Sequence, residues 1–410
     1  MYAKSKIVFA IMFLVWVAFL LGCVERSTTG SVFLSSEPSG AEIWIDDFNT
    51  KKVTPAIING LSEEKHSYIL KKEGYKDKEG VFLILAGETV SIDIVLEAIV
   101  TTTTPTPTQT IIPTPIHPIG CLIFHQADEK IAYNWFSYVP ASLTKVERGY
   151  ILITGVFGAV PPTDNYSQVT EQARAQARGY LGLAETKKYI LLIPVIPRPS
   201  TNHVYAVAFD WKVFLSSSDP FVQRPDMKVN LMIDRLRGDL QRDGYNVHEK
   251  VFVEGFSAGG MFAQRYALLH PARVQAIAAG QSGGSIVLPE SSYNGIELDW
   301  PVAVNDFPTL VGYKFDQATY KQVPQFIYIG DQDTKNSTLR GAGELWRTQS
   351  QIDFLNTTFG ATDPIRLRNQ CDYLKKLGYN ITFKEYAGIG HQFTNQMLDD
   401  VFAFFSANRY

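Results

Sequence analysis

The spacing of hydrophobic positions along this chain changes between its N-terminal and C-terminal parts. Between residues 30 and 97, apolar and polar residues alternate, as in AEIWID and VSIDIVL, and turn sequences such as EPSG and NG separate the runs. Alternation of this kind predicts strands that bury one face only. Residues 30–97 are therefore predicted to form a small β-sandwich.

After residue 118 the apolar residues come in continuous runs. The runs are YILIT, YILLIP, VFVE, VQAIAAG and QFIYIG. Continuous runs suit strands that are buried on both faces of a parallel sheet. Between the second and third runs, Val229, Ile233 and Leu240 belong to a set of apolar residues at helical spacing. The alternation of strands and helices predicts an α/β domain over residues 119–410, with helices on both faces of a mostly parallel sheet.

A linker separates the two predicted domains. Residues 101–115 read TTTTPTPTQTIIPTP, in which threonine and proline repeat without an apolar period. Proline fixes the backbone and removes hydrogen-bond donors, so an extended, semi-rigid spacer is predicted over residues 98–118.

The N-terminus has the layout of an export signal. Two lysines precede an uncharged apolar run from Ile7 to Leu21. The run ends in LLGC, which resembles a lipoprotein cleavage box with Cys23 as the lipid-bearing residue. Residues 1–23 are therefore predicted to be a signal peptide with a lipoprotein box, and an uncleaved membrane anchor is the alternative. Either form tethers the protein at the extracellular face of the cell membrane.

Composition, cysteine content and the absence of certain motifs limit the kinds of ligand and partner that the sequence predicts. The formal net charge is −3 and both signs are interspersed, so no basic patch for nucleic acid is expected. An exported compartment permits Cys121 and Cys371 to pair, but two separate buried thiols are the preferred interpretation. The chain contains no H-E-x-x-H signature and no glycine-rich phosphate loop. No metal and no cofactor are therefore expected.

The sequence VFVEGFSAGGMF, at residues 251–262, carries the candidate chemistry. It places Ser257 between Gly255 and Gly259, directly after a predicted buried strand and before a predicted helix. This is the context that a nucleophile elbow requires, because larger side chains at the flanking positions would clash with the neighbouring strand or helix. An ordinary tight turn of small residues is the alternative.

A serine nucleophile needs a base and an acid that orients the base. In this type of site the acid and then the histidine follow the serine along the chain. Of the seven histidines, His117 falls in the predicted linker, and only His270 and His391 follow the serine. His270 stands at a helix end before proline, where a capping role is expected. His391 lies on a glycine-bracketed loop between a strand and the last helix, and it is the predicted base.

The acid is expected after the strand QFIYIG, at the carboxyl end of the sheet. Asp333 is the predicted acid because it stands three residues after Gly330, and Asp331 is the alternative. The oxyanion hole needs two backbone donors. One is predicted to be the amide of Ala258, directly after the nucleophile. The other is predicted to be the amide of Val156, in the loop after the strand YILIT. Phe157 is the alternative to Val156, because the usual His-Gly pair is absent from this loop.

Residues 30–97 resemble a PEGA domain. The resemblance rests on SSEPSGAEIWIDD, TPAIINGL and KKEGY, which begin at residues 35, 54 and 71. It implies a spacer or adhesion module, with a cell-surface glycan or protein as its partner.

Residues 119–410 resemble the α/β-hydrolase superfamily. The sequence EGFSAGGMFAQRYALLHPARVQAIAAGQSGG looks most like the branch of polyhydroxyalkanoate depolymerase-like and feruloyl-esterase-like enzymes. The resemblance implies a secreted serine esterase that forms an acyl-enzyme and uses no cofactor. Its ester substrate is left open, with polymeric and carbohydrate-linked esters both among the candidates.

Two other functions remain open at this point. A serine peptidase of the same fold has the same three catalytic residue types, and a surface adhesion or scaffold protein would keep the fold without activity. The aromatic residues within HVYAVAFDWKVF, residues 203–214, are either part of the substrate pocket or part of the core.

Overall fold

The computed structural model describes residues 29–99, 117–154, 163, 165–197, 209, 221–334, 337 and 347–409. The chain divides into two compact units, Met1–Thr104 and Pro105–Tyr410. Within the described residues, no helix combines the length and the apolar character needed to cross a bilayer.

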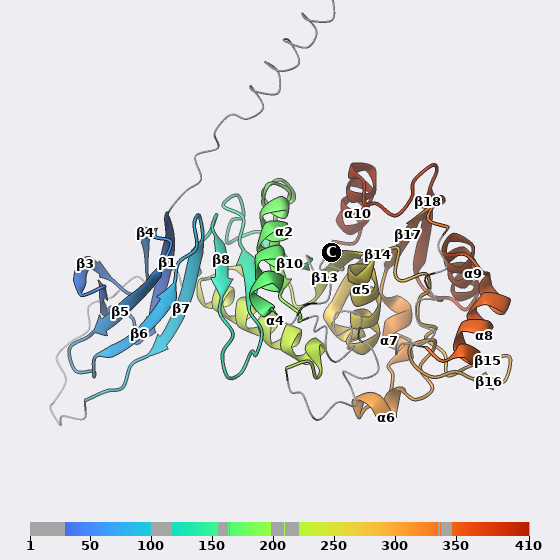
Figure 1. Cartoon of the computed structure of the whole chain (residues 1–410), viewed down its shortest axis with the longest axis horizontal. Helices are drawn as coiled ribbons and strands as arrows, with labels where there is room; N and C mark the ends of the chain where they lie inside the picture. Colours follow the sequence, from blue (N-terminus) through green and yellow to red (C-terminus); the bar gives the residue numbers. More distant parts are fainter. Residues whose placement is uncertain are drawn as a thin grey trace, which may run out of the picture. The chain divides into compact units, whose positions relative to one another are not determined.

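The small unit consists of two β-sheets (Figure 1). In the first sheet, β1 lies between a parallel neighbour, β7, and an antiparallel neighbour, β4. The second sheet has the order β3-β2-β5-β6, and all of its neighbours are antiparallel. Buried and more exposed residues alternate along β2 and β5, as the sequence predicted for a sandwich. The strands of this unit are β1 (Thr29–Glu37), β2 (Glu42–Ile45), β3 (Phe48–Val53), β4 (Ala56–Ser62), β5 (Lys65–Lys71), β6 (Lys78–Leu83) and β7 (Thr89–Val95).

The large unit alternates strands and helices along the chain. Its strands are β8 (Leu122–His125), β9 (Trp135–Tyr138), β10 (Arg148–Ile153), β11 (Tyr189–Pro194), β12 (Asn246–Val247), β13 (Val251–Phe256), β14 (Val274–Gly280), β15 (Ser292–Tyr293), β16 (Ile296–Glu297), β17 (Gln325–Gly330) and β18 (Ile381–Tyr386). Its α-helices are α2 (Tyr166–Lys187), α4 (Pro225–Arg242), α5 (Ala258–Leu269), α6 (Phe307–Val311), α7 (Gln317–Gln322), α8 (Gln349–Phe359), α9 (Asp363–Lys376) and α10 (Asn395–Ala407).

The main sheet of the large unit has the order β8-β9-β11-β10-β13-β14-β17-β18. Strand β9 is antiparallel to both of its neighbours, and all pairs from β11 to β18 are parallel. The carboxyl ends of β10, β13, β14, β17 and β18 therefore meet at one edge of the sheet. This strand order, with helices on both faces, confirms the predicted α/β-hydrolase fold class (Figure 1).

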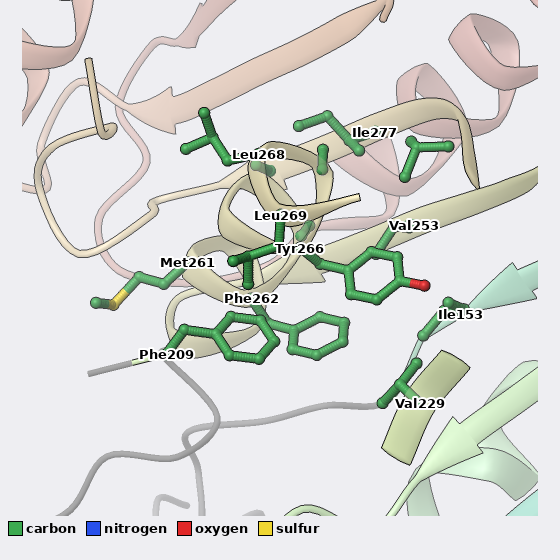
Figure 2. Packing of buried hydrophobic residues seen from close by; sticks show 14 of the residues in the cluster. Ile153, Phe209, Val229, Val253, Met261, Phe262, Tyr266, Leu268, Leu269 and Ile277 are labelled. Atoms are coloured by element: carbon green, nitrogen blue, oxygen red, sulfur yellow. The ribbon is translucent and has the colours of Figure 1, made fainter. Parts of the chain in front are cut away.

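Successive side chains of the central strands enter different cores. On β13, Val251 and Val253 belong to the core that contains residues of α4, α5, α8 and α9, whereas Phe252 belongs to the core that contains residues of α2 and α10. This double burial explains why the strands read as continuous apolar runs. In the first core, Phe209 stacks on Phe262 of α5 with ring centroids 5.2 Å apart (Figure 2). Phe209 is fully buried, so this member of the aromatic stretch at residues 203–214 is a core residue.

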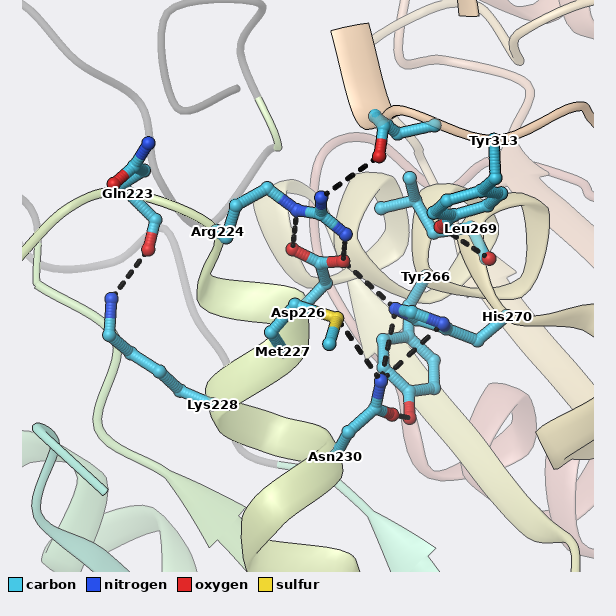
Figure 3. A network of polar contacts seen from close by, with 11 residues as sticks. Gln223, Arg224, Asp226, Met227, Lys228, Asn230, Tyr266, Leu269, His270 and Tyr313 are labelled. Atoms are coloured by element: carbon cyan, nitrogen blue, oxygen red, sulfur yellow. Dashed lines mark hydrogen bonds and ion pairs between the residues drawn. The ribbon is translucent and has the colours of Figure 1, made fainter. Parts of the chain in front are cut away.

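A buried polar network joins the beginning of α4 to the end of α5 (Figure 3). Asp226 is fully buried and accepts hydrogen bonds from Arg224 Nε at 2.9 Å and Nη2 at 2.7 Å. Its Oδ2 also lies 2.9 Å from His270 Nε2. Burial raises the pKa of Asp226, but the contacts with His270 and Arg224 outweigh it and leave this pKa below its ordinary value. His270 is the cap residue at the end of α5, and its side chain pairs with Asp226.

His117 and the two cysteines of the large unit differ in part from the sequence expectation. His117, predicted to lie in the linker, is buried: its backbone N–H donates to Asp243 Oδ2 at 2.6 Å, and its Nε2 lies 2.9 Å from Ser137 Oγ. Cys121 and Cys371 are both free thiols, as the preferred interpretation held, but only Cys371 is buried, whereas Cys121 is partly buried. Burial raises the pKa of each thiol.

Candidate active site

Ser257 occupies a strained turn between β13 and α5. Its backbone angles are φ 59° and ψ −119°, a conformation that residues other than glycine rarely adopt. Such a conformation costs about 1–3 kcal/mol and persists only where the surrounding structure enforces it. The N–H of Ser257 donates to the carbonyl of Gly280 on β14 at 2.8 Å, which fixes the turn to the neighbouring strand.

Close backbone contacts explain the small residues around Ser257. A Cβ atom on Gly255 would lie 2.2 Å from the carbonyl carbon of Gly259, and a Cβ atom on Gly260 would lie 2.3 Å from the carbonyl oxygen of Gly280. No side chain fits at either distance. Gly255 and Gly259 thus lie against one another as the elbow hypothesis requires, and Gly260 is a further requirement that the sequence interpretation missed.

The structure brings Ser257, His391 and Asp333 together. His391 Nε2 lies 3.2 Å from Ser257 Oγ, and His391 Nδ1 lies 2.6 Å from Asp333 Oδ2. The Asp333 side chain is 1% exposed, whereas 36% of the His391 side chain is exposed. A carboxylate facing Nδ1 requires a proton on that nitrogen, so Nε2 presents its lone pair to the serine hydroxyl. This is the arrangement in which a histidine accepts a proton from a serine.

The loops that carry the acid and the histidine are bonded to each other through their backbones. Asp331 N–H donates to Tyr386 O at 3.0 Å, and Gln332 N–H donates to Ile389 O at 2.9 Å. A Cβ atom on Gly330 would lie 2.1 Å from Ile389 O, so only glycine permits this approach. Asp331 Oδ1 accepts the N–H of Gly388 at 2.8 Å. Asp331 therefore supports the histidine loop, while Asp333 is the carboxylate that contacts His391.

Ala258 is the first residue of α5, and it is buried. Its amide lies at the N-terminus of the helix, where the unpaired N–H groups and the helix dipole favour a developing negative charge. The predicted second donor, Val156, and its alternative, Phe157, lie outside the described residues, as does the predicted lipid-bearing residue Cys23.

Glu254, three residues before Ser257, is a buried group that the sequence interpretation did not assign. Its Oε2 accepts hydrogen bonds from Thr154 Oγ1 at 2.5 Å and from Tyr180 OH at 2.9 Å. Burial raises the pKa of the Glu254 carboxyl, although both hydroxyls oppose the rise. The contact with Thr154 joins β13 to the end of β10. A single carboxyl within an otherwise apolar strand was the sequence signal for this contact.

Within the ranges that the structure describes, no three side chains of His, Cys, Asp or Glu gather so that they could hold a metal ion. The arrangement of Ser257, His391 and Asp333 instead suits proton transfer between neighbouring side chains.

Several solved structures are similar to this chain. Poly(aspartic acid) hydrolase-1 from Sphingomonas sp. KT-1 is 18% identical, with a TM-score of 0.44, and the match covers 67% of this chain and 92% of that one. A poly(3-hydroxybutyrate) depolymerase from Bordetella parapertussis is 17% identical, with a TM-score of 0.44 and coverages of 70% and 90%. An esterase from the planctomycete Thermogutta terrifontis is 13% identical, with a TM-score of 0.38 and coverages of 67% and 87%.

No curated protein matches the chain. The family model of the PEGA domain matches residues 29–99, which span all of the strands of the small unit. The resemblance seen in the sequence is therefore confirmed for this unit, and residues 29–99 are a PEGA domain.

Proposed function

We propose that this protein is a serine hydrolase that cleaves carboxylic esters through an acyl-enzyme. The observation that carries the proposal is the position of His391, with Nε2 3.2 Å from Ser257 Oγ and Nδ1 2.6 Å from the buried Asp333 carboxylate. The strained turn at Ser257 supports it further, because strain of this kind is concentrated at functional sites.

In the proposed reaction, Ser257 Oγ forms a bond with the carbonyl carbon of the ester while its proton moves to His391 Nε2. The Asp333 carboxylate stabilises the resulting imidazolium, and the amide of Ala258 donates to the oxyanion, with Val156 as the predicted second donor. The bond from carbon to the alcohol oxygen then breaks, and Nε2 returns the proton to that oxygen. A water molecule repeats the sequence on the acyl-enzyme, releases the acid and restores Ser257.

A fluorophosphonate probe tests the nucleophile directly, because it reacts with activated serines. The full chain is expected to be labelled, and Ser257→Ala is expected to abolish the labelling. Turnover should then be measured on short aryl esters and, in parallel, on peptide amides of the same acyl groups. A wild-type protein that is neither labelled nor active on any ester would contradict the proposal. Cleavage of the amides as well as of the esters would assign the site to a peptidase instead.

We further propose that the chain is exported and tethered to the outer face of the membrane through a lipid on Cys23. The proposal is supported by the lysines, the apolar run and the LLGC sequence at residues 1–23. Metabolic labelling with a fatty-acid analogue is expected to mark the wild-type protein and not the Cys23→Ser variant. Lipid labelling that persists in this variant would exclude the assignment.

A further inference from the structure

We propose that Phe256 and Phe393 form an apolar subsite for the alcohol half of the ester, so that the preferred substrates are esters of aromatic or aliphatic alcohols. The inference rests on the proposed function, because it requires His391 to return a proton to the departing alcohol. It goes further by naming the class of alcohol and the side chains that contact it.

Two phenylalanine rings lie beside the imidazole of His391. The Phe256 ring centroid is 5.2 Å from that of His391, and the Phe393 centroid is 5.6 Å from that of Phe256. The buried ring of Tyr328 lies 6.4 Å from Phe256 and 6.3 Å from Phe393. The three aromatic rings thus form one contiguous apolar group, which contacts the imidazole through Phe256.

The two phenylalanines are open to solvent to different degrees. Phe256 is partly buried, whereas Phe393 is 36% exposed. Phe393 follows His391 by two residues, so its exposed surface belongs to the same loop as the reactive imidazole. A single exposed apolar residue is ordinary on a protein surface. An exposed ring that continues a buried aromatic group up to a reactive imidazole is instead suited to bind an apolar ligand.

The chemistry of acyl transfer decides which half of the substrate meets these rings. The oxygen of the leaving alcohol must come within hydrogen-bonding distance of His391 Nε2, because this nitrogen protonates it. The carbonyl oxygen must point to the amide of Ala258 instead. The substituent on the alcohol oxygen is therefore the part of the ester next to the imidazole. Phe256 contacts the imidazole and Phe393 contacts Phe256, so these two rings are the apolar side chains that we assign to this half of the ester.

The test varies the alcohol and keeps the acyl group constant. Values of kcat/KM should be measured for benzyl, hexyl and 2-hydroxyethyl butyrate and for a butyryl ester of methyl glucoside. The full chain, Phe393→Ala and Phe393→Leu are compared with Phe48→Ala, which removes a phenylalanine that is 78% exposed in the PEGA domain. A second series of benzyl acetate, butyrate and hexanoate varies only the acyl group.

The wild type is expected to prefer the benzyl and hexyl esters to the 2-hydroxyethyl and sugar esters. Phe393→Ala should reduce this preference roughly five- to tenfold, because an apolar group loses part of its buried contact surface. Phe393→Leu should restore part of the preference, since it remains apolar, and Phe48→Ala should leave it unchanged. The acyl series should keep its wild-type ratios in every variant.

The outcomes separate this inference from the proposed function. If the fluorophosphonate labels Ser257 and esters are cleaved, but Phe393→Ala leaves the alcohol preference unchanged, the subsite is wrong and the esterase proposal stands. A change confined to the acyl series would assign the rings to the acyl half and overturn the inference, as would a wild-type preference for the sugar ester. Absence of both labelling and turnover would overturn the inference together with the proposed function.

Discussion

Replacing Asp333 with asparagine removes the negative charge of the proposed catalytic acid and keeps its shape. The change is expected to leave the fold intact, because the amide oxygen of asparagine is able to accept the hydrogen bond of His391 Nδ1, now 2.6 Å from Asp333 Oδ2. The other carboxylate oxygen, Oδ1, has no hydrogen-bond partner among the described residues, so no known contact is lost there. The variant therefore removes the charge of the acid and, because the asparagine NH2 group is also able to face Nδ1, weakens its control of the imidazole tautomer.

The expected loss follows from the separation of the two charges. The imidazolium that forms on His391 has its charge centre about 4 Å from that of the carboxylate, and an effective dielectric constant of about 20 gives an interaction of about 4 kcal/mol. The Asp333 side chain is 1% exposed and that of His391 36% exposed, so the dielectric constant used for the pair is that of a site near the surface. Since 1.36 kcal/mol corresponds to a tenfold change in rate, Asp333→Asn should lower kcat about 10³-fold.

Asp331→Asn is the matched control on the same loop. Asp331 Oδ1 accepts the N–H of Gly388, and an asparagine oxygen at the same position is able to do the same. A loss of less than about tenfold in kcat is expected, because only a neutral backbone contact is affected. The assay is the hydrolysis of a short aryl ester, with circular dichroism to verify that both variants fold. Equal losses in the two variants, or a greater loss in Asp331→Asn, would refute the reasoning and reassign the acid.

Three further predictions concern stability. Asp226→Ala should lower the free energy of unfolding by about 3–5 kcal/mol, because it leaves the half-buried Arg224 guanidinium and the His270 ring without the buried carboxylate that they contact, and Asp226→Asn should cost about half as much; equal unfolding midpoints in urea would contradict this. Burial lowers the pKa of His117 to about 4 and that of His125 well below its ordinary value. Below about pH 6.5 the unfolded chain therefore binds protons that the folded chain does not bind. Stability from this source should be nearly complete above about pH 7.5 and should fall as the pH decreases through about 6.5, by about 2 kcal/mol at pH 5 from His117 alone. The urea midpoint should depend less on pH in His125→Phe, and an unchanged dependence would count against the explanation. Gly260→Ala, whose Cβ would lie 2.3 Å from a carbonyl oxygen, should lower the melting temperature and reduce fluorophosphonate labelling. Gly179→Ala is the control on α2: its Cβ would have no atom within 4 Å, so the change should be neutral or stabilising by up to about 1 kcal/mol.

The central strands of the large unit were predictable because their burial on both faces is visible in the sequence. The runs at β10, β11, β13, β14 and β17 contain almost no polar residues, and each is followed by a helical or loop pattern. Strands β8 and β9 carry no such signal, since each is four residues long and they contain His125 and Ser137. Their place in the sheet depends on pairing with each other and with β11, which is a tertiary contact.

Sequence reasoning found the three side chains of the candidate triad, but not the contacts that hold them. The choice between Asp331 and Asp333 was a matter of loop spacing, and it is the bond from Gly388 to Asp331 that separates their roles in the structure. The contact between Glu254 and Thr154 joins residues 100 positions apart in the chain, and no local pattern encodes a pairing at that distance.

The geometry of the site and its specificity are encoded by different kinds of residue. Glycines set the geometry: Gly260 lets α5 approach β14, and Gly330 lets the acid loop approach the histidine loop. A substitution at either position moves whole segments of backbone, so we expect it to affect every substrate alike. Phe393, by contrast, lies at the exposed end of an aromatic group, where a substitution removes contact surface without displacing the backbone. Substrate preference is therefore expected to change through the aromatic residues around His391 and not through the glycines, since only the former contact one half of the ester selectively.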